Sequence, residues 1–156
     1  EIFLYDGSST TQLTDNSYDD SNAQVYESNV VWQGYEGGND AEIFLYDGNT
    51  TTQLTDNSYN DYGHEIYASN VVWRGHDGND YEIFLYDGSS TTQLTDNSYD
   101  DDRKRVEEAK GVWLGRHDGN DEEIFLYDGS TTNQLNDNSY DDSNAKVYET
   151  NVVWQG

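Results

Sequence analysis

The sequence of 156 residues contains no cysteine, proline or methionine, and it has few basic side chains: 7 lysines and arginines stand against 32 aspartates and glutamates. Without cysteine the chain cannot form disulfides, use a thiol nucleophile or bind a metal through thiolates. The net charge of −25 opposes contact with phosphate backbones and anionic lipids, so we expect neither nucleic acid nor a membrane as a partner. No apolar run approaches the roughly 18 residues that can cross a bilayer.

The chain consists of one repeat. The string E-I-F-L-Y-D-G begins at Glu1, Glu42, Glu82 and Glu123, and a tryptophan follows each of these glutamates by 31 positions. Every length difference between repeats therefore falls between the tryptophan and the next glutamate, in a Gly- and Asp-rich segment that is typical of a surface loop. A period near 40 residues predicts either propeller blades or an array of helices. The short β-branched and aromatic runs favour the strands of blades.

Each repeat predicts four strands, which in the first whole repeat cover Ala23–Ser28, Asn29–Gly34, Glu42–Gly48 and Thr51–Thr55. In the third strand Ile43 and Leu45 point to one face and Phe44 to the other, so both faces are apolar. A strand that is buried on both faces needs a layer on each side, which blades stacked around an axis provide. The fourth strand is mostly threonine and glutamine and is expected at the outer edge.

The order of these motifs resembles a known family. The succession N-V-V-W-Q-G, acidic Gly-rich loop, E-I-F-L-Y-D-G and T-T-Q-L-T is similar to the TolB-like, WD40-related propeller repeat over the whole chain. The chain departs from that family in lacking a Ser-Pro-Asp-Gly turn, and it turns instead through Ser28 and Asn29. Residues 1–20 equal residues 82–101 at every position, which resembles a recently amplified propeller of the cyanobacterial type or a designed or reconstructed one. The resemblance implies a periplasmic or extracellular location.

We therefore predict an all-β propeller of four-stranded antiparallel blades, with residues 1–156 as a single domain. Three blades are expected over residues 15–55, 56–95 and 96–136, and a split blade over residues 137–156 plus 1–14. In that split blade Glu1–Thr14 and Ala145–Gly156 are complementary halves. Pairing them would remove exposed sheet edges.

The split blade leads to a prediction about partners. Four blades in one ring would have to meet at about 90°, and propellers span about four to eight blades. We expect a homodimer that closes an eight-bladed ring, in which each chain completes a blade of the other. The alternative is a self-closed four-bladed monomer. A separate protein partner also stays open.

We find no arrangement of residues that predicts catalysis or a cofactor. The histidines, His64, His76 and His117, lie in or beside predicted loops without the spacing of a metal site, and we expect them to be exposed.

The acidic loops are candidates for Ca²⁺ because oxygen ligands at alternate positions suit this ion. The pattern D-x-S-x-D places candidate ligands at Asp15, Ser17 and Asp19, at Asp96 and Asp100, and at Asp137 and Asp141. The same residues build Asx turns, which we favour. The D-G-N-D loops at residues 77–80 and 118–121 are expected to be turns for the same reason.

One segment breaks the acidic pattern. Arg103, Lys104, Arg105, Lys110 and Arg116 lie close together in the sequence, where the other repeats have uncharged or acidic residues. They form either a partner-binding or self-association patch or a set of solvated charges, and we favour the solvated charges. The expected function is a non-enzymatic binding or scaffold module. The alternative is a lectin-like or Ca²⁺-binding propeller with one equivalent site in each blade.

Overall fold

The computed structural model describes residues 1–35, 37, 40–107, 110–116 and 121–156. For residues 103, 104 and 107 it describes the strand and not the side chains. Within these ranges every regular element is a strand. Three complete sheets comprise β3 (Asp20–Tyr26), β4 (Asn29–Gly34), β5 (Glu42–Tyr46) and β6 (Thr51–Gln53); β7 (Tyr62–Tyr67), β8 (Asn70–His76), β9 (Tyr81–Tyr86) and β10 (Thr91–Gln93); and β11 (Asp102–Glu107), β12 (Lys110–Gly115), β13 (Glu123–Tyr127) and β14 (Thr132–Gln134). Two further sheets have two strands each: β1 (Phe3–Tyr5) with β2 (Thr10–Gln12), and β15 (Ser143–Tyr148) with β16 (Asn151–Gln155).

Each complete sheet has the strand order and pairing of a blade. In the first, β3, β4, β5 and β6 follow one another in space as in sequence, and every neighbouring pair is antiparallel. The four predicted strands are confirmed, with small differences at their ends. The first strand starts earlier than predicted because Asp20 pairs with Gly34, and a β-bulge between Ser21 and Gln24 lets the strand continue past this pair.

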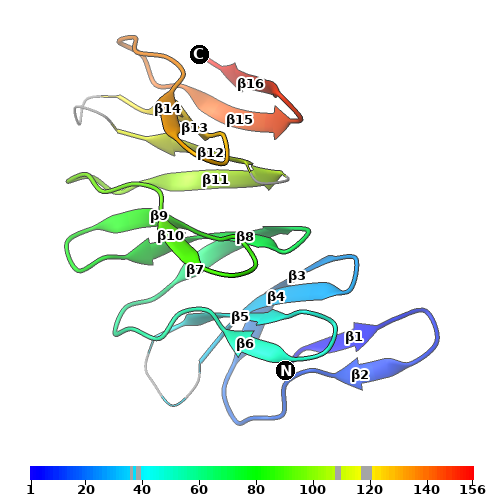
Figure 1. Ribbon diagram of the computed structural model, residues 1–156. Helices are drawn as coiled ribbons and strands as arrows, with labels where there is room; N and C mark the ends of the chain where they lie inside the picture. Colours follow the sequence, from blue (N-terminus) through cyan, green and yellow to red (C-terminus); the bar gives the residue numbers. More distant parts are fainter. Residues whose placement is uncertain (36, 38–39, 108–109, 117–120) are drawn as a thin grey trace.

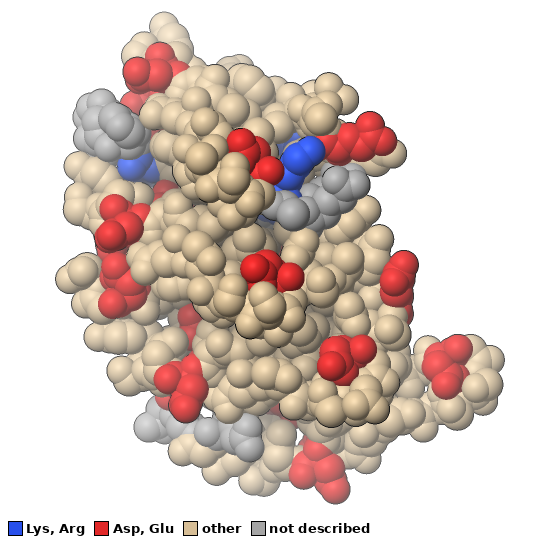
Figure 2. Space-filling view, in the orientation of Figure 1, with Lys and Arg blue, Asp and Glu red and all other residues tan. Residues whose placement is uncertain are grey.

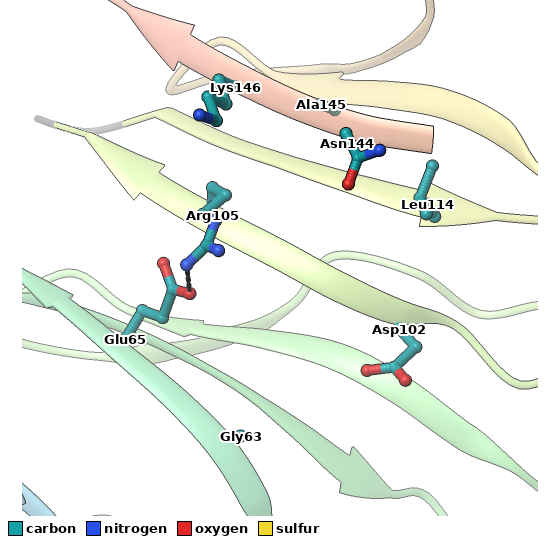
Figure 3. A pocket seen from close by; sticks show the side chains of 8 residues that line it. All are labelled: Gly63, Glu65, Asp102, Arg105, Leu114, Asn144, Ala145 and Lys146. Atoms are coloured by element: carbon teal, nitrogen blue, oxygen red, sulfur yellow. Dashed lines mark hydrogen bonds and ion pairs between the residues drawn. The ribbon is translucent and has the colours of Figure 1, made fainter. Parts of the chain in front are cut away.

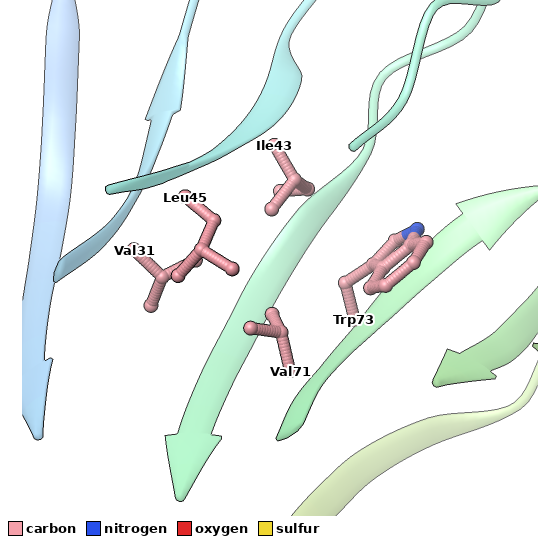
Figure 4. Close-up of a cluster of buried hydrophobic side chains, with 5 residues drawn as sticks. All are labelled: Val31, Ile43, Leu45, Val71 and Trp73. Carbon is pink, nitrogen blue, oxygen red and sulfur yellow. The ribbon is translucent and has the colours of Figure 1, made fainter. Parts of the chain in front are cut away.

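The blades stack face to face, so each strand in the middle of a blade is buried on both sides (Figure 1). Val31, Ile43 and Leu45 of one blade pack against Val71 and Trp73 of the next (Figure 4). The opposite face of the same blade carries Val30, Trp32 and Phe44, which pack against Ile2 of β1–β2. The alternation of apolar residues along the third strand thus has the predicted cause.

The two half-blades lie at opposite ends of the stack (Figure 1). β1 and β2 form one sheet, β15 and β16 form another, and the three complete blades separate them. The chain has the shape of an open arc, and the predicted split blade is present as two separate halves.

An Asp-Gly turn follows the third strand in every repeat. Asp47 Oδ1 accepts hydrogen bonds from the backbone N–H of Asn49 at 2.8 Å and of Thr50 at 2.7 Å. Gly48 takes a φ of 93°, which glycine adopts without steric cost. In the equivalent turns of later repeats, the backbone N–H groups after Asp87 and Asp128 lower the pKa of these aspartates to about 2, because they stabilise the ionised carboxylate.

Candidate binding face on the inner strands

The first strands of the blades line the inner side of the arc, and they enclose a cavity. β7, β11 and β15 lie side by side there and hold a cavity of about 300 Å³ (Figure 3). Its lining combines two acidic side chains, two basic ones, one amide and small or apolar residues, namely Glu65, Asp102, Arg105, Lys146, Asn144, Gly63, Leu114 and Ala145. A ligand in this cavity would meet charges of both signs.

One position of the inner strand differs in every blade. Gln24, Glu65, Arg105 and Lys146 pair with the valine at the same place in the second strand of their blades. Some of these residues form a hydrogen bond or an ion pair with the neighbouring blade. Gln24 Nε2 donates to the carbonyl of His64 at 2.8 Å, and the Arg105 guanidinium forms an ion pair with Glu65.

A β-bulge precedes this position in each blade and sets the direction of its side chain. Asn22, Gly63 and Asn144 occupy the bulge with φ values of 56°, 62° and 56°. Asparagine and glycine accept this left-handed conformation more readily than other residues. Because the extra residue re-aims the chain, the side chain after the bulge takes the place on the inner face.

The two histidines that the structure describes both differ from the sequence-based expectation, since His64 is buried and His76, at the end of β8, is half-buried. His64 lies on β7 and is buried, with Nε2 at 2.8 Å from the carbonyl oxygen of Asn22, so the prediction of an exposed loop histidine was wrong there. The reason is the close approach of the neighbouring blade. His76 stacks on Tyr59 at 4.2 Å between ring centroids, and His117 lies outside the described residues.

Buried carboxyl groups that were not predicted from the sequence join consecutive blades. At the first complete junction, Thr55 Oγ1 donates to Glu42 Oε2 at 2.5 Å, and the backbone N–H of Asn57 donates to Glu42 Oε1 at 3.1 Å. Asn57 Nδ2 also donates to Asp61 Oδ2 at 2.6 Å. Glu82 with Asp101 and Glu123 with Asp142 repeat this arrangement at the next junctions. A glutamate and an aspartate 19 positions apart in every repeat were the available signal.

The paired carboxyl groups at the two junctions between complete blades that Asp61 and Asp101 occupy favour the protonated form. Burial raises the pKa of Asp61 to about 7, and the negative charge of Glu42 adds to the effect. Burial also raises the pKa of Asp101 to about 8, together with a hydrogen bond to Glu82 and the charge of that residue. The pKa of Glu82 itself is raised by burial. The acid groups at a junction therefore retain a proton at pH values where exposed carboxyl groups have lost theirs.

The predicted Ca²⁺ ligands occupy exposed loops. Asp15, Ser17, Asp19, Asp96 and Asp137 all lie on the surface. Asp100 Oδ1 accepts from the backbone N–H of Tyr81 and Asp141 Oδ1 from that of Glu122, both at 3.0 Å, so these two carboxylates hold the start of a third strand. Asparagine closes the turn in each loop, as where Asn16 Oδ1 accepts from the N–H of Tyr18 at 2.7 Å.

A different set of acidic groups lies closer together. Candidate ligand oxygens of Asp77, Asp80 and Glu82 are within 4.8 Å of one another. Both carboxylate oxygens of Asp80 are buried and have no hydrogen-bond partner. Asp77 and Asp80 lie in the D-G-N-D loop that was expected to be a turn, and Glu82 lies on β9. Asp77 does accept in that loop from the N–H of Asn79 at 2.8 Å.

The three side chains of the basic segment that the structure describes lie in different places. Arg105 faces the cavity, Lys110 donates to the carbonyl of Glu149 on the next blade, and Arg116 follows the other end of β12. The side chains of Arg103 and Lys104 lie outside the described residues. Figure 2 shows the acidic side chains spread over the visible face and the basic ones in its upper part, where β11 and β12 lie.

Comparison with known proteins identifies the fold. No family model matches the chain, and no curated protein matches it in sequence. Among solved structures, the β-propeller domain of the Trilobed protease from Pyrococcus furiosus, described as having an open velcro topology, matches with a TM-score of 0.65 and 14% identity over 86% of this chain and 42% of its own. This chain is a β-propeller module.

Two further structures agree with this assignment. Acylaminoacyl peptidase from Pyrococcus horikoshii matches with a TM-score of 0.66 and 18% identity, over 86% of this chain and 22% of its own. A putative TolB from Agrobacterium tumefaciens matches with a TM-score of 0.51 and 19% identity, over 70% of this chain and 45% of its own. The propeller module spans less than half the length of each of these proteins. Its described residues include no helix with the length and apolarity needed to cross a membrane.

Proposed function

We propose that this propeller is a non-enzymatic binding and scaffold module that contacts a polypeptide partner through its inner strands. The observation that carries the proposal is where the near-identical blades differ. The third strand reads E-I-F-L-Y in all four repeats, whereas the inner position reads Gln24, Glu65, Arg105 and Lys146. Residues that maintain the fold stay the same from blade to blade, so the variable inner position is free to serve recognition. Concave faces of repeat proteins commonly do so.

The lining supports a polypeptide as the class of partner. Glu65 and Arg105 offer opposite charges, and Asn144 offers an amide beside Lys146 (Figure 3). A peptide presents charges of both signs together with backbone donors and acceptors, which matches such a surface. The net charge of −25 opposes a polyanion at the same place.

A peptide library selected against the immobilised 156-residue chain tests this proposal. We expect the selected peptides to lose at least tenfold in affinity for a variant with Q24A, E65Q, R105Q and K146Q. They should bind a control with the exposed loop tyrosines changed, Y18S with Y140S, as they bind the original chain. Equal affinity for the inner-strand variant would place the binding elsewhere. A change in peptide mass after incubation would contradict a non-enzymatic role.

Calcium binding is the second candidate, and the cluster of Asp77, Asp80 and Glu82 favours it. Ca²⁺ prefers carboxylate oxygens as ligands, and the two buried oxygens of Asp80 have no hydrogen-bond partner. A ligand that binds the folded chain alone raises its melting temperature. Ca²⁺ should therefore raise it in the original chain and not in D80N, while D96N, an exposed neighbour, keeps the response. An unchanged melting temperature in the original chain would remove this candidate.

A further inference from the structure

The terminal half-blades expose side chains that complete blades bury. Phe3 is 60% exposed, whereas Phe44, the same residue one repeat later, is 7% exposed. Trp154 and Val153 are 41% and 63% exposed, whereas the equivalent Trp32 and Val31 are 1% and 0% exposed. The sequence around them is the same, so the difference comes from the two strands that each half-blade lacks.

The exposed large apolar side chains of the described residues fall into two groups. One group is a single loop tyrosine in each blade, namely Tyr18, Tyr59, Tyr99 and Tyr140. The other group comprises Phe3, Tyr5, Val25, Tyr148, Val153 and Trp154. This second group lies on the first three-strand segment of the chain and on its last hairpin, at the two ends of the arc (Figure 1). The apolar surface is therefore concentrated where the arc stops.

We propose that a second copy of this chain covers these surfaces, with β16 of one copy pairing with β1 of the other to complete a four-stranded blade. The strands have the required sequences: β1 is the counterpart of β5, and β16 is the counterpart of β4. In the complete blade β4 and β5 are antiparallel neighbours. The inference concerns the ends of the arc and stands apart from the binding role of the inner strands.

The complete blade fixes the register of this pairing. Trp32 lies opposite Phe44 and Val31 opposite Leu45, and the rings of Trp32 and Phe44 stack at 5.8 Å between centroids. Transferred to the ends of the arc, these pairs place Trp154 opposite Phe3 of the second copy, and Val153 opposite its Leu4. The stack that both terminal aromatics lack would then form.

The apolar clusters between blades point to the same partner. The cluster around Val31 also contains Ile43, Leu45, Val71 and Trp73. The cluster between β1–β2 and the first complete blade includes Ile2, Leu4, Val30 and Trp32. These four residues are the counterparts of Ile43, Leu45, Val71 and Trp73, in that order. The missing member of this second cluster is the counterpart of Val31, and in the proposed pairing that residue is Val153 of the second copy.

The separation of the two terminal half-blades favours a second copy over closure of the chain on itself. β1 and β16 lie at opposite ends of the stack, beyond the three complete blades (Figure 1). The chain superposes with a TM-score of 0.65 on a propeller domain of which it covers 42%, so that propeller domain extends well beyond the part that the arc matches. Two copies supply six complete blades and two composite ones. The resulting ring of eight blades is within the known range of about four to eight.

Light scattering coupled to gel filtration tests the size of the assembly. The 156-residue chain at micromolar concentration should have twice its 17.8 kDa mass. V153K should return it to the mass of one chain, because a charge would replace a buried valine of the composite blade. The control Y140K changes a more exposed side chain away from the edges and should stay at twice the mass. A mass of 17.8 kDa, or of more than two chains, for the unaltered protein would overturn the proposal.

Cysteine cross-linking is a second, separate test of the register. Only introduced cysteines can react, because the chain has no cysteine of its own. A mixture of two single variants, F3C and W154C, should give a cross-linked pair under oxidising conditions. The control mixture of F3C with V153C shifts the thiol to the other face of the strand and should not cross-link. Equal cross-linking in both mixtures would contradict the register. In the double variant F3C with W154C, a cross-linked product with the mass of one chain would show self-closure instead.

Discussion

The middle blades and the terminal half-blades contain the same sequence in two environments. Trp73 is enclosed between its own blade and the preceding one, and it stacks on Phe84 at 5.8 Å between centroids. Trp154 lies on β16, whose outer edge has no neighbouring strand, and it is exposed. Burial in this protein is therefore a property of the neighbouring strand and blade, and a half-blade cannot supply it alone. Changes made at matching positions measure what the neighbour contributes.

The largest difference is expected between the two tryptophans. Trp73→Ala should lower the free energy of unfolding by about 3–5 kcal/mol, because it removes a buried aromatic and leaves a cavity. Trp154→Ala should cost about half of that or less in a single chain, because 41% of this side chain is already exposed. Urea denaturation at submicromolar concentration measures both values. Equal losses would show that the terminal half-blade is packed as tightly as the middle ones.

The blades could be predicted from the sequence because their signals are local. The alternation along E-I-F-L-Y and the constant 31-residue spacing to the tryptophan specify strands that are buried on both faces. The position of His64 could not be predicted in this way. Its burial depends on the bulge at Gly63 and on the carbonyl of Asn22 in the preceding blade, 42 residues away.

The buried carboxyl pairs at the junctions between blades could be predicted only in part from the sequence. The 19-residue spacing from Glu82 to Asp101 is visible in the sequence, but so are many other acidic repeats in a chain with 32 acidic residues. What distinguishes these two is burial, which follows from the stacking of one blade on the next. The spacing in the sequence does not show which acidic residues are buried. The cavity on the inner strands likewise becomes visible only when three blades lie side by side.

The second largest effect is expected from pH, through the junctions between complete blades. Asp61 and Asp101 have pKa values of about 7 and 8 in the folded chain, against about 3.9 for an unfolded one. Between these values the folded chain holds protons that the unfolded chain releases, so the stabilisation is complete below about pH 4 and is lost as pH rises through 7 to 8. The turn carboxylates have the opposite sign. Asp87, with a pKa of about 2, stabilises the fold above about pH 4 and less as pH falls.

The chain should therefore be most stable near pH 4 to 5. Raising the pH from 5 to 8.5 should cost on the order of 2–4 kcal/mol, measured by urea denaturation across that range. Asp101→Asn should flatten the dependence, because the amide cannot ionise, whereas Asp96→Asn in the neighbouring exposed loop should leave it unchanged. A stability that stays constant or rises between pH 5 and pH 8.5 would contradict the proton-holding junction.

A smaller effect is expected at the glycine that lies over each junction carboxylate. A Cβ added at Gly115 would overlap with Asp101 Oδ1 and would lie 3.1 Å from the Phe125 ring. At Gly156 the added atom would meet Asp142 Oδ1 at 2.7 Å, with no ring atom of the described residues within 4 Å. Gly115→Ala should therefore cost about 1–3 kcal/mol and Gly156→Ala less. Thermal melts followed by circular dichroism compare the two, and an equal cost would mean that the ring contact is relieved by a small shift.

The smallest effect is expected from the charges on the inner strands. The ion pair of Arg105 with Glu65 joins two complete blades, but the arginine side chain is 58% exposed and water screens the pair. A double-mutant cycle with R105Q and E65Q should give a coupling of less than about 1 kcal/mol, which falls further as salt is added. Lys146→Gln, on the inner strand of the terminal half-blade, should change the unfolding free energy by about 0.5 kcal/mol or less. A coupling above 2 kcal/mol would mean that this pair helps to hold the blades together. A small coupling leaves these positions free to vary between blades without loss of the fold, which a face used for recognition requires.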